Sequence, residues 1–148
     1  MKYVEWGIEA AYLLVLCRIA YTDRKEQKIE PWTHGATLLL ACLEILFQMG
    51  EPMGSRILGA GIISMPMLIL TVLLKGGFGG GDIKLMGASG FLLGYRNIVM
   101  SAGAGIILGG VYAGYMLVTG RMGRKDSFAL GPFLAMGIIG VKLWTSIS

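Results

Sequence analysis

The chain has 148 residues, a length that fits a single domain spanning 1–148; 55% of the residues are hydrophobic and 15% are charged. The mean hydropathy of +0.68 and the 24 glycines exclude an ordinary soluble globule and are typical of a polytopic helical membrane protein. The net charge of +4 does not indicate nucleic-acid binding, because the cations lie between apolar runs and form no basic stripe interleaved with aromatics.

Six apolar segments follow one another, most of them close to the ~20 residues that a helix needs to cross a bilayer. In chain order they are 4–20, 32–48, 57–74, 83–95, 98–119 and 128–147. None alternates apolar and polar residues as the strands of a membrane barrel do. The predicted fold is therefore all-α, a polytopic bundle of six transmembrane helices with a short fourth helix, in which Pro66 kinks the third.

The loops between these segments differ in charge. One set carries nine cations, namely Arg18, Arg24, Lys25, Lys28, Lys75, Lys84, Arg121, Arg124 and Lys125. The other set carries four, namely Lys2, Arg56, Arg96 and Lys142. Cytoplasmic loops are the ones enriched in Lys and Arg, so the sequence predicts an inner (plasma) membrane protein with both termini outside. Asp23, the glycine run before Asp82 and the loop 120–127 then share the cytoplasmic side.

The run from Gly76 to Asp82 holds five glycines and the single side chain Phe78 before its aspartate. A helix from Asp82 to Arg96 is about 21 Å long at ~1.5 Å per residue, whereas the hydrocarbon core is about 30 Å thick. Asp82 is therefore expected below the inner interface, beside backbone that is shielded by protein or lines a wet cavity. A carboxylate at membrane depth predicts a functional site. A phosphate-binding loop is excluded, because that motif ends in Gly-Lys-Ser or Gly-Lys-Thr.

Asp23, just beyond the first apolar segment, is expected to face Asp82 across the bundle. Structural roles are the alternatives, with Asp23 as an interfacial residue and Asp82 as a helix N-cap. Two carboxyl groups a few ångströms apart do not both ionise easily, so they share a proton. The ionised group activates water for attack on a peptide carbonyl, and the protonated group hydrogen-bonds to the carbonyl oxygen. Glycines without side chains let the loop approach an extended peptide.

Metal and disulfide chemistry are not predicted. Cys17 and Cys42 lie in different apolar segments with no Cys-x-x-Cys pair, and His34 is the single histidine. No metal and no organic cofactor are expected.

Two further features predict packing. Glu9 and Glu44 are costly in apolar segments, so each is expected to be neutral or to pair with Arg56 or Lys142. Small residues at four-residue spacing along segment 98–119 predict close helix contacts; they are Ser101, Gly105 and Gly109, then Gly110 and Gly114. This spacing makes no prediction of oligomeric state.

Three motifs together resemble the type IV prepilin peptidases, the Gly-x-Gly-Asp class of intramembrane aspartic proteases. Asp23 precedes a basic stretch and Ile29-Glu30-Pro31, where the family has Ile-Pro-Asn. The stretch from Gly79 to Lys84 is similar to the family's Gly-x-Gly-Asp-x-Lys, and Leu130 to Gly137 is similar to its Gly-Pro-Phe-Leu-Ala segment. The resemblance covers nearly the whole chain, from Asp23 to Gly137.

The resemblance implies that Asp23 and Asp82 are the catalytic pair and that Gly79, Gly81 and Lys84 position the loop or the substrate. It implies removal of short basic leader peptides from prepilins or pseudopilins, after a glycine, at the cytoplasmic face. The two Cys-x-x-Cys pairs of the bifunctional methylating members have no counterpart here, which favours a peptidase-only branch.

Three alternatives stay open at this point. Archaeal preflagellin peptidases share the same aspartate chemistry. A small channel or transporter would use the glycine run as a re-entrant loop and Asp82 as an ion ligand. A non-catalytic subunit of a pilus machine would bind prepilin without cutting it.

Overall fold

The computed structural model describes residues 2–26, 28–76, 78–123 and 129–148, and within these segments it is helical, with no strand. The helices are α1 (Lys2–Glu26), α2 (Pro31–Leu46), α3 (Met53–Ile62), α4 (Ser64–Leu73), α5 (Gly80–Val118) and α6 (Gly131–Ile147). The all-α prediction is confirmed. The start predicted at Phe128 for the last helix lies outside the described residues.

α3 and α4 form one bent rod, which corresponds to the predicted third segment. The bend lies at Ile63, with φ −104° and ψ −43°, three residues before Pro66. Proline has no N–H for the carbonyl of the residue four positions earlier, here Ile62, and its ring pushes that carbonyl away. The Ser64 hydroxyl donates a hydrogen bond to the carbonyl of Ala60 beside the bend. The predicted kink is confirmed and lies one turn before the proline.

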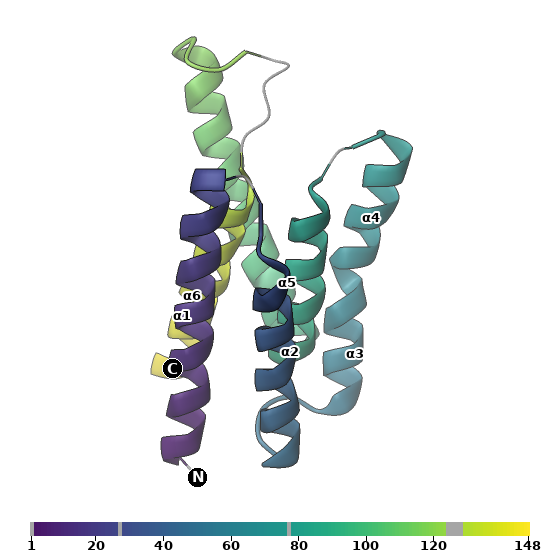
Figure 1. Ribbon diagram of the computed structural model, residues 1–148, viewed down its shortest axis with the longest axis vertical. Helices are drawn as coiled ribbons and strands as arrows, with labels where there is room; N and C mark the ends of the chain where they lie inside the picture. The colour runs from purple at the N-terminus through teal and green to yellow at the C-terminus, as the bar shows by residue number, and fades with distance from the viewer. Residues whose placement is uncertain (1, 27, 77, 124–128) are drawn as a thin grey trace.

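α5 is two helices joined by a reversal at Gly94, where φ is +79° and ψ is 168°. We call residues 80–93 the first arm and residues 95–118 the second arm; the second arm runs back past the start of the first (Figure 1). A Cβ at position 94 would lie 2.7 Å from Cγ of Glu51, so both the dihedral angles and the space require glycine. The two arms correspond to the predicted short fourth helix and the predicted fifth helix.

The described residues therefore form six helical rods: α1, α2, the α3–α4 rod, the two arms of α5, and α6. α6 packs against both α1 and α5, while α2 and α3 pack against α5. Leu16, Ile19, Leu85, Leu134 and Ile138 fill the centre of the bundle and are essentially inaccessible to solvent. Both termini lie toward the same end of the bundle (Figure 1).

The outer surface is strongly apolar. Val72, Leu73, Ile107, Val111 and Val118 are between 66% and 88% exposed, which a soluble monomer does not tolerate over so wide an area. By length and hydropathy, two described stretches, Met53–Leu73 and Gly80–Val118, are able to cross a membrane, and α6 is a shorter apolar helix. These features support a helical membrane protein. The count of six spans stays a prediction.

The predicted ion pairs are present. The Arg56 guanidinium contacts the Glu44 carboxylate at 2.9 Å, and Lys142 Nζ lies 3.2 Å from Glu9 Oε1. The Glu44–Arg56 pair is buried between α2 and α3, whereas the Glu9–Lys142 pair is partly exposed between α1 and α6. Glu9 and Glu44 thus each have their charge compensated within the bundle.

Glycines also set the distances between helices. Gly137 on α6 faces the backbone of Ser101 and Gly105, which confirms a packing role for the first part of the small-residue series. Among the described residues, no atom lies within 4 Å of a Cβ placed on Gly110 or Gly114, so neither glycine serves this packing.

The contact between α3 and the first arm yields a stability prediction. A Cβ on Gly90 would overlap the carbonyl group of Gly59 and lie 3.1 Å from the backbone nitrogen of Ala60. We expect Gly90→Ala to lower the free energy of unfolding by about 1–3 kcal/mol, because backbone cannot move aside as a side chain can. Gly103→Ala is the control, since nothing lies within 4 Å there. Thermal unfolding in detergent measures both variants; equal stability would contradict the tight contact.

Candidate active site

Asp23 lies on the last turn of α1, which continues to Glu26 and so runs further than the apolar segment predicted it to. The side chain is only 6% exposed, and its Oδ2 has no hydrogen-bond partner among the described residues. A buried acceptor without a donor is unfavourable unless something else approaches it. Asp23 is therefore not a solvated interfacial charge.

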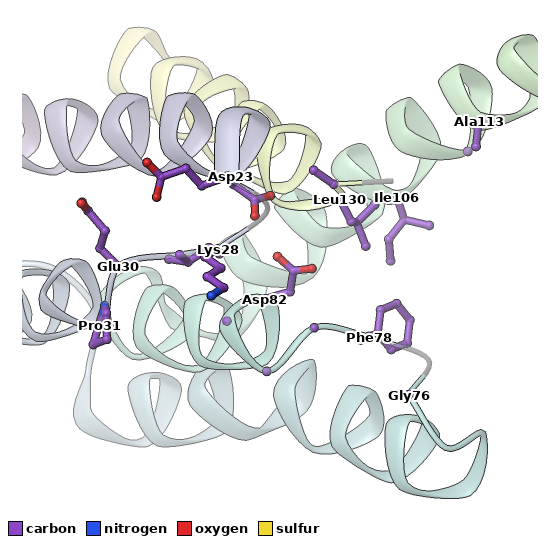
Figure 2. Close-up of a pocket in the computed structure, with 17 residues that line it drawn as sticks. Asp23, Lys28, Glu30, Pro31, Gly76, Phe78, Asp82, Ile106, Ala113 and Leu130 are labelled. Atoms are coloured by element: carbon purple, nitrogen blue, oxygen red, sulfur yellow. The ribbon is translucent and has the colours of Figure 1, made fainter. Parts of the chain in front are cut away.

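Asp82 lies in the first turn of α5 rather than at its N-cap, which is Gly79. The backbone N–H groups of Asp82 and Ile83 both donate to the Gly79 carbonyl, at 3.1 and 3.2 Å. Gly80 and Gly81 are already helical, so the non-helical glycine backbone is shorter than the sequence suggests. The Asp82 carboxylate is not used as an N-cap and is directed toward α1 (Figure 2).

The two carboxyl groups converge beside Gly131, the first residue of α6. Asp82 Oδ1 lies 3.2 Å from the point where a Cβ on Gly131 would stand, and Asp23 Oδ2 lies closer still to the same point. Because each of these oxygens lies within 3.2 Å of the same point, the distance between them is less than twice 3.2 Å. Gly131 has no side chain that could stand between them. Figure 2 shows the two side chains facing each other from α1 and α5.

The environment favours a shared proton. Burial raises the pKa of the Asp23 carboxyl group above its ordinary value, and the neighbouring backbone N–H of Gly131 lowers it by a smaller amount. A second carboxylate this close disfavours ionisation of both groups together. Within the described segments the pair belongs to no group of three or more His, Cys, Asp or Glu that could hold a metal ion. One ionised and one protonated carboxyl group are suited to general acid–base chemistry.

A cavity of about 1130 Å³ opens over the pair, and its two ends differ in chemistry. One end carries charged residues from the end of α1 and from the α1–α2 connection, namely Glu26, Lys28 and Glu30. The other end is apolar and is formed by Phe78, Ile106, Ala113 and Leu130. Figure 2 shows Lys28 and Glu30 on one side of the carboxyl groups, and Phe78, Ile106 and Leu130 on the other.

The charged end is partly held in place by α1. Arg18 donates hydrogen bonds to both carboxylate oxygens of Glu30 at 3.3 Å, and the Trp32 indole donates to Oε2 at 2.9 Å. The Arg18 guanidinium lowers the pKa of Glu30 below its ordinary value, so this group stays ionised. The next residue, Pro31, begins α2, which suits proline because the first helical N–H needs no partner there.

The predicted positioning residues divide into two groups. Gly79 and Gly81 line the cavity, and a Cβ on Gly81 would lie 3.1 Å from Cβ of Ile29, so glycine lets the α1–α2 connection pack against the start of α5. Lys84 is exposed and does not line the cavity. Phe78, Gly131 and the second-arm residues were not predicted as site residues, although Gly131 belongs to a motif that the sequence displays.

The position of Gly131 yields a prediction. Its missing side chain is the space in which the two carboxyl groups meet, so Gly131→Ala places a methyl group against both. We expect the variant to insert and fold while losing at least about 100-fold in cleavage rate, since small displacements of reacting groups carry large rate penalties. Gly140→Ala on the same helix is the control, with open space around its Cβ. Full activity in Gly131→Ala would contradict the close approach.

Comparison with known proteins identifies the family of the chain. No solved structure matches the chain. A prepilin leader peptidase/N-methyltransferase of Bacillus subtilis (strain 168) is 30% identical over 88 residues, which are 60% of this chain and 36% of that relative. The chain thus spans little more than a third of the relative it matches. The model of the Type IV leader peptidase family matches residues 10–114, a stretch that includes both aspartates. The chain therefore belongs to the type IV leader peptidase family.

Proposed function

We propose that the protein is a membrane aspartic endopeptidase that removes the leader peptide from type IV prepilins or pseudopilins. The observation that carries the proposal is the convergence of Asp23 and Asp82 under a cavity large enough for a peptide. Family membership and the resemblance to a prepilin leader peptidase support the substrate class.

The proposed reaction needs only the two aspartates and water. The ionised carboxylate takes a proton from a water molecule, whose oxygen then bonds to the carbonyl carbon of the scissile peptide. The protonated carboxyl group donates its proton to the carbonyl oxygen, which gives a tetrahedral diol. The C–N bond then breaks as the amine takes the proton that the first carboxylate had gained from water. The other carboxylate takes a proton from a hydroxyl of the diol, and the new carboxyl group forms. The pair ends the cycle with one proton between Asp23 and Asp82, as it began.

The proposed topology has six helices crossing the inner membrane, both termini outside and the aspartates toward the cytoplasm. The nine cations of the loops on the aspartate side support this orientation, against four on the other side. Glu26 at the charged end of the cavity is proposed to meet a short basic leader, since Glu30 is paired with Arg18, and the cut is proposed to follow a glycine. We propose cleavage without methyl transfer, because Cys17 and Cys42 form no Cys-x-x-Cys pair.

The test is cleavage by the purified protein in detergent or proteoliposomes, with a prepilin and an archaeal preflagellin as separate substrates. We expect mass spectrometry to find one cut after a glycine in the prepilin, insensitive to a metal chelator. Cleavage of the preflagellin alone would move the assignment to that substrate class. Ion or solute flux without any peptide cleavage would overturn the peptidase proposal in favour of a channel or transporter.

A further inference from the structure

The second arm of α5 presents an open face to the cavity. Ile106, Gly110 and Ala113 stand three to four residues apart, so they share one side of the helix, and all three line the cavity. Within the part of the chain that the structure describes, no atom lies within 4 Å of a Cβ placed on Gly110. The neighbouring small residues Gly105 and Gly109 are used for packing against α6, whereas Gly110 is left facing empty space.

This face lines the same cavity as a buried carboxylate oxygen that lacks a hydrogen bond. Asp23 lines the same cavity, and its side chain is only 6% exposed. Its Oδ2 has no hydrogen-bond partner among the described residues. Phe78 stands across from Ile106 (Figure 2), and Leu130 lines the same cavity. A bound peptide would suit this cavity. Its polar backbone would supply the hydrogen bond that Asp23 Oδ2 lacks, and its apolar side chains would lie between Phe78, Leu130 and Ile106.

We infer that this face of the second arm, formed by Ile106, Gly110 and Ala113, is the binding track for the apolar segment that follows the scissile bond of the substrate. The inference rests on the proposed function. The charged end of the cavity and its apolar end lie on opposite sides of the carboxyl groups (Figure 2). With the leader proposed at the charged end, the residues after the cut lie at the apolar end. Glycine at 110 allows the substrate backbone to approach the helix closely, as small residues do at contacts within membranes.

The first experiment compares two substrates that share a leader and cleavage site but differ beyond it. One continues with an apolar segment and the other with a polar segment of equal length. We expect the wild type to prefer the apolar substrate, and Gly110→Leu to lower the ratio of kcat/KM between the two substrates at least tenfold. Gly103→Leu is the matched control, since it is also a helical glycine of the second arm with open space but does not line the cavity.

A ratio that is unchanged in Gly110→Leu overturns the inference, including the case in which cleavage of both substrates falls equally. A wild type with no preference for the apolar substrate overturns it as well. In either case cleavage by the wild type leaves the proposed function intact. A wild type that cleaves neither substrate removes the proposed function itself.

The second experiment measures binding without cleavage. Asp82→Asn is combined with serine at Cys17 and Cys42, and a single cysteine is placed by Ala113→Cys or, as the control, by Gly103→Cys. A substrate with one cysteine in its apolar segment is then oxidised with each variant. We expect a disulfide-linked adduct with Ala113→Cys and none with Gly103→Cys. Equal adduct from both positions, or none from Ala113→Cys, overturns the inference.

Discussion

Replacing either Asp23 or Asp82 with asparagine is expected to lower the rate of leader cleavage by about 10³-fold or more, because in the proposed mechanism each carboxyl group acts in turn as acid and as base. The amide is nearly isosteric with the acid, so both variants should insert and fold. Leader loss is measured by mass after co-expression with a prepilin. Glu5→Gln, the same chemical change on the exposed first turn of α1, is the control and should cleave like the wild type. Cleavage that persists in either aspartate variant removes that residue from the mechanism.

The same substitution at Asp23 is expected to stabilise the fold at neutral pH. Burial raises the pKa of Asp23 in the folded state. A carboxyl group with a raised folded-state pKa binds its proton more tightly when the protein is folded, so its contribution to stability is fully present at a pH below the unfolded-state pKa. That stabilisation is lost as the pH rises through the folded-state pKa, which leaves a buried, poorly solvated charge. Asp23→Asn removes the charge and should gain about 1 kcal/mol at neutral pH, with no gain at a pH below the ordinary range of aspartate.

Thermal unfolding of the wild type and Asp23→Asn at the two pH values measures this effect. A higher melting temperature for the variant at neutral pH, together with lost cleavage, would show that the fold tolerates an unfavourable group for the sake of the reaction. A variant that is less stable at neutral pH would show instead that the ionised carboxylate is compensated in the fold.

The features of this fold that the sequence predicts are those decided by neighbours along the chain. Apolar runs long enough to form helices mark all six rods, and Pro66 marks the bend between α3 and α4. The sequence also predicts that Glu44 is either neutral or paired with Arg56 or Lys142, because few cations are within reach of a buried acid. The structure pairs it with Arg56. Family motifs select Asp23 and Asp82 from the nine acidic residues of the chain.

What the sequence does not predict depends on which helix faces meet. Nothing local to Gly131 indicates that two carboxyl groups converge on it, since they come from α1 and α5. The division of the small residues is of the same kind: Gly109 packs against α6, but its neighbour Gly110 opens into the cavity. Adjacent residues on a helix point about 100° apart, so their roles separate only once the helices are placed.

The second large effect is expected at the opposite end of the first arm from Asp82, at Arg56. This side chain is 1% exposed and donates to the carbonyls of Glu51, Met49, Phe91 and Leu92 as well as to Glu44 Oε2, at 2.9 to 3.3 Å. Phe91 and Leu92 precede the reversal at Gly94, where the helix carbonyls have no partners within the helix. Arg56 therefore both neutralises Glu44 and caps the end of the arm that carries Asp82.

Arg56→Met is expected to lower the free energy of unfolding by about 3–5 kcal/mol, because it leaves Glu44 buried without a counter-charge. Lys142→Met breaks the partly exposed pair with Glu9 and should lose less than about 1 kcal/mol. The double variant Glu44→Leu/Arg56→Met separates two contributions: removing the unpaired charge restores part of the stability, and the remaining deficit measures the uncapped carbonyls. Unfolding in detergent at graded denaturant reports all three variants. Full recovery in the double variant would mean that Arg56 serves only to neutralise Glu44, and that the reversal at Gly94 holds the first arm without it.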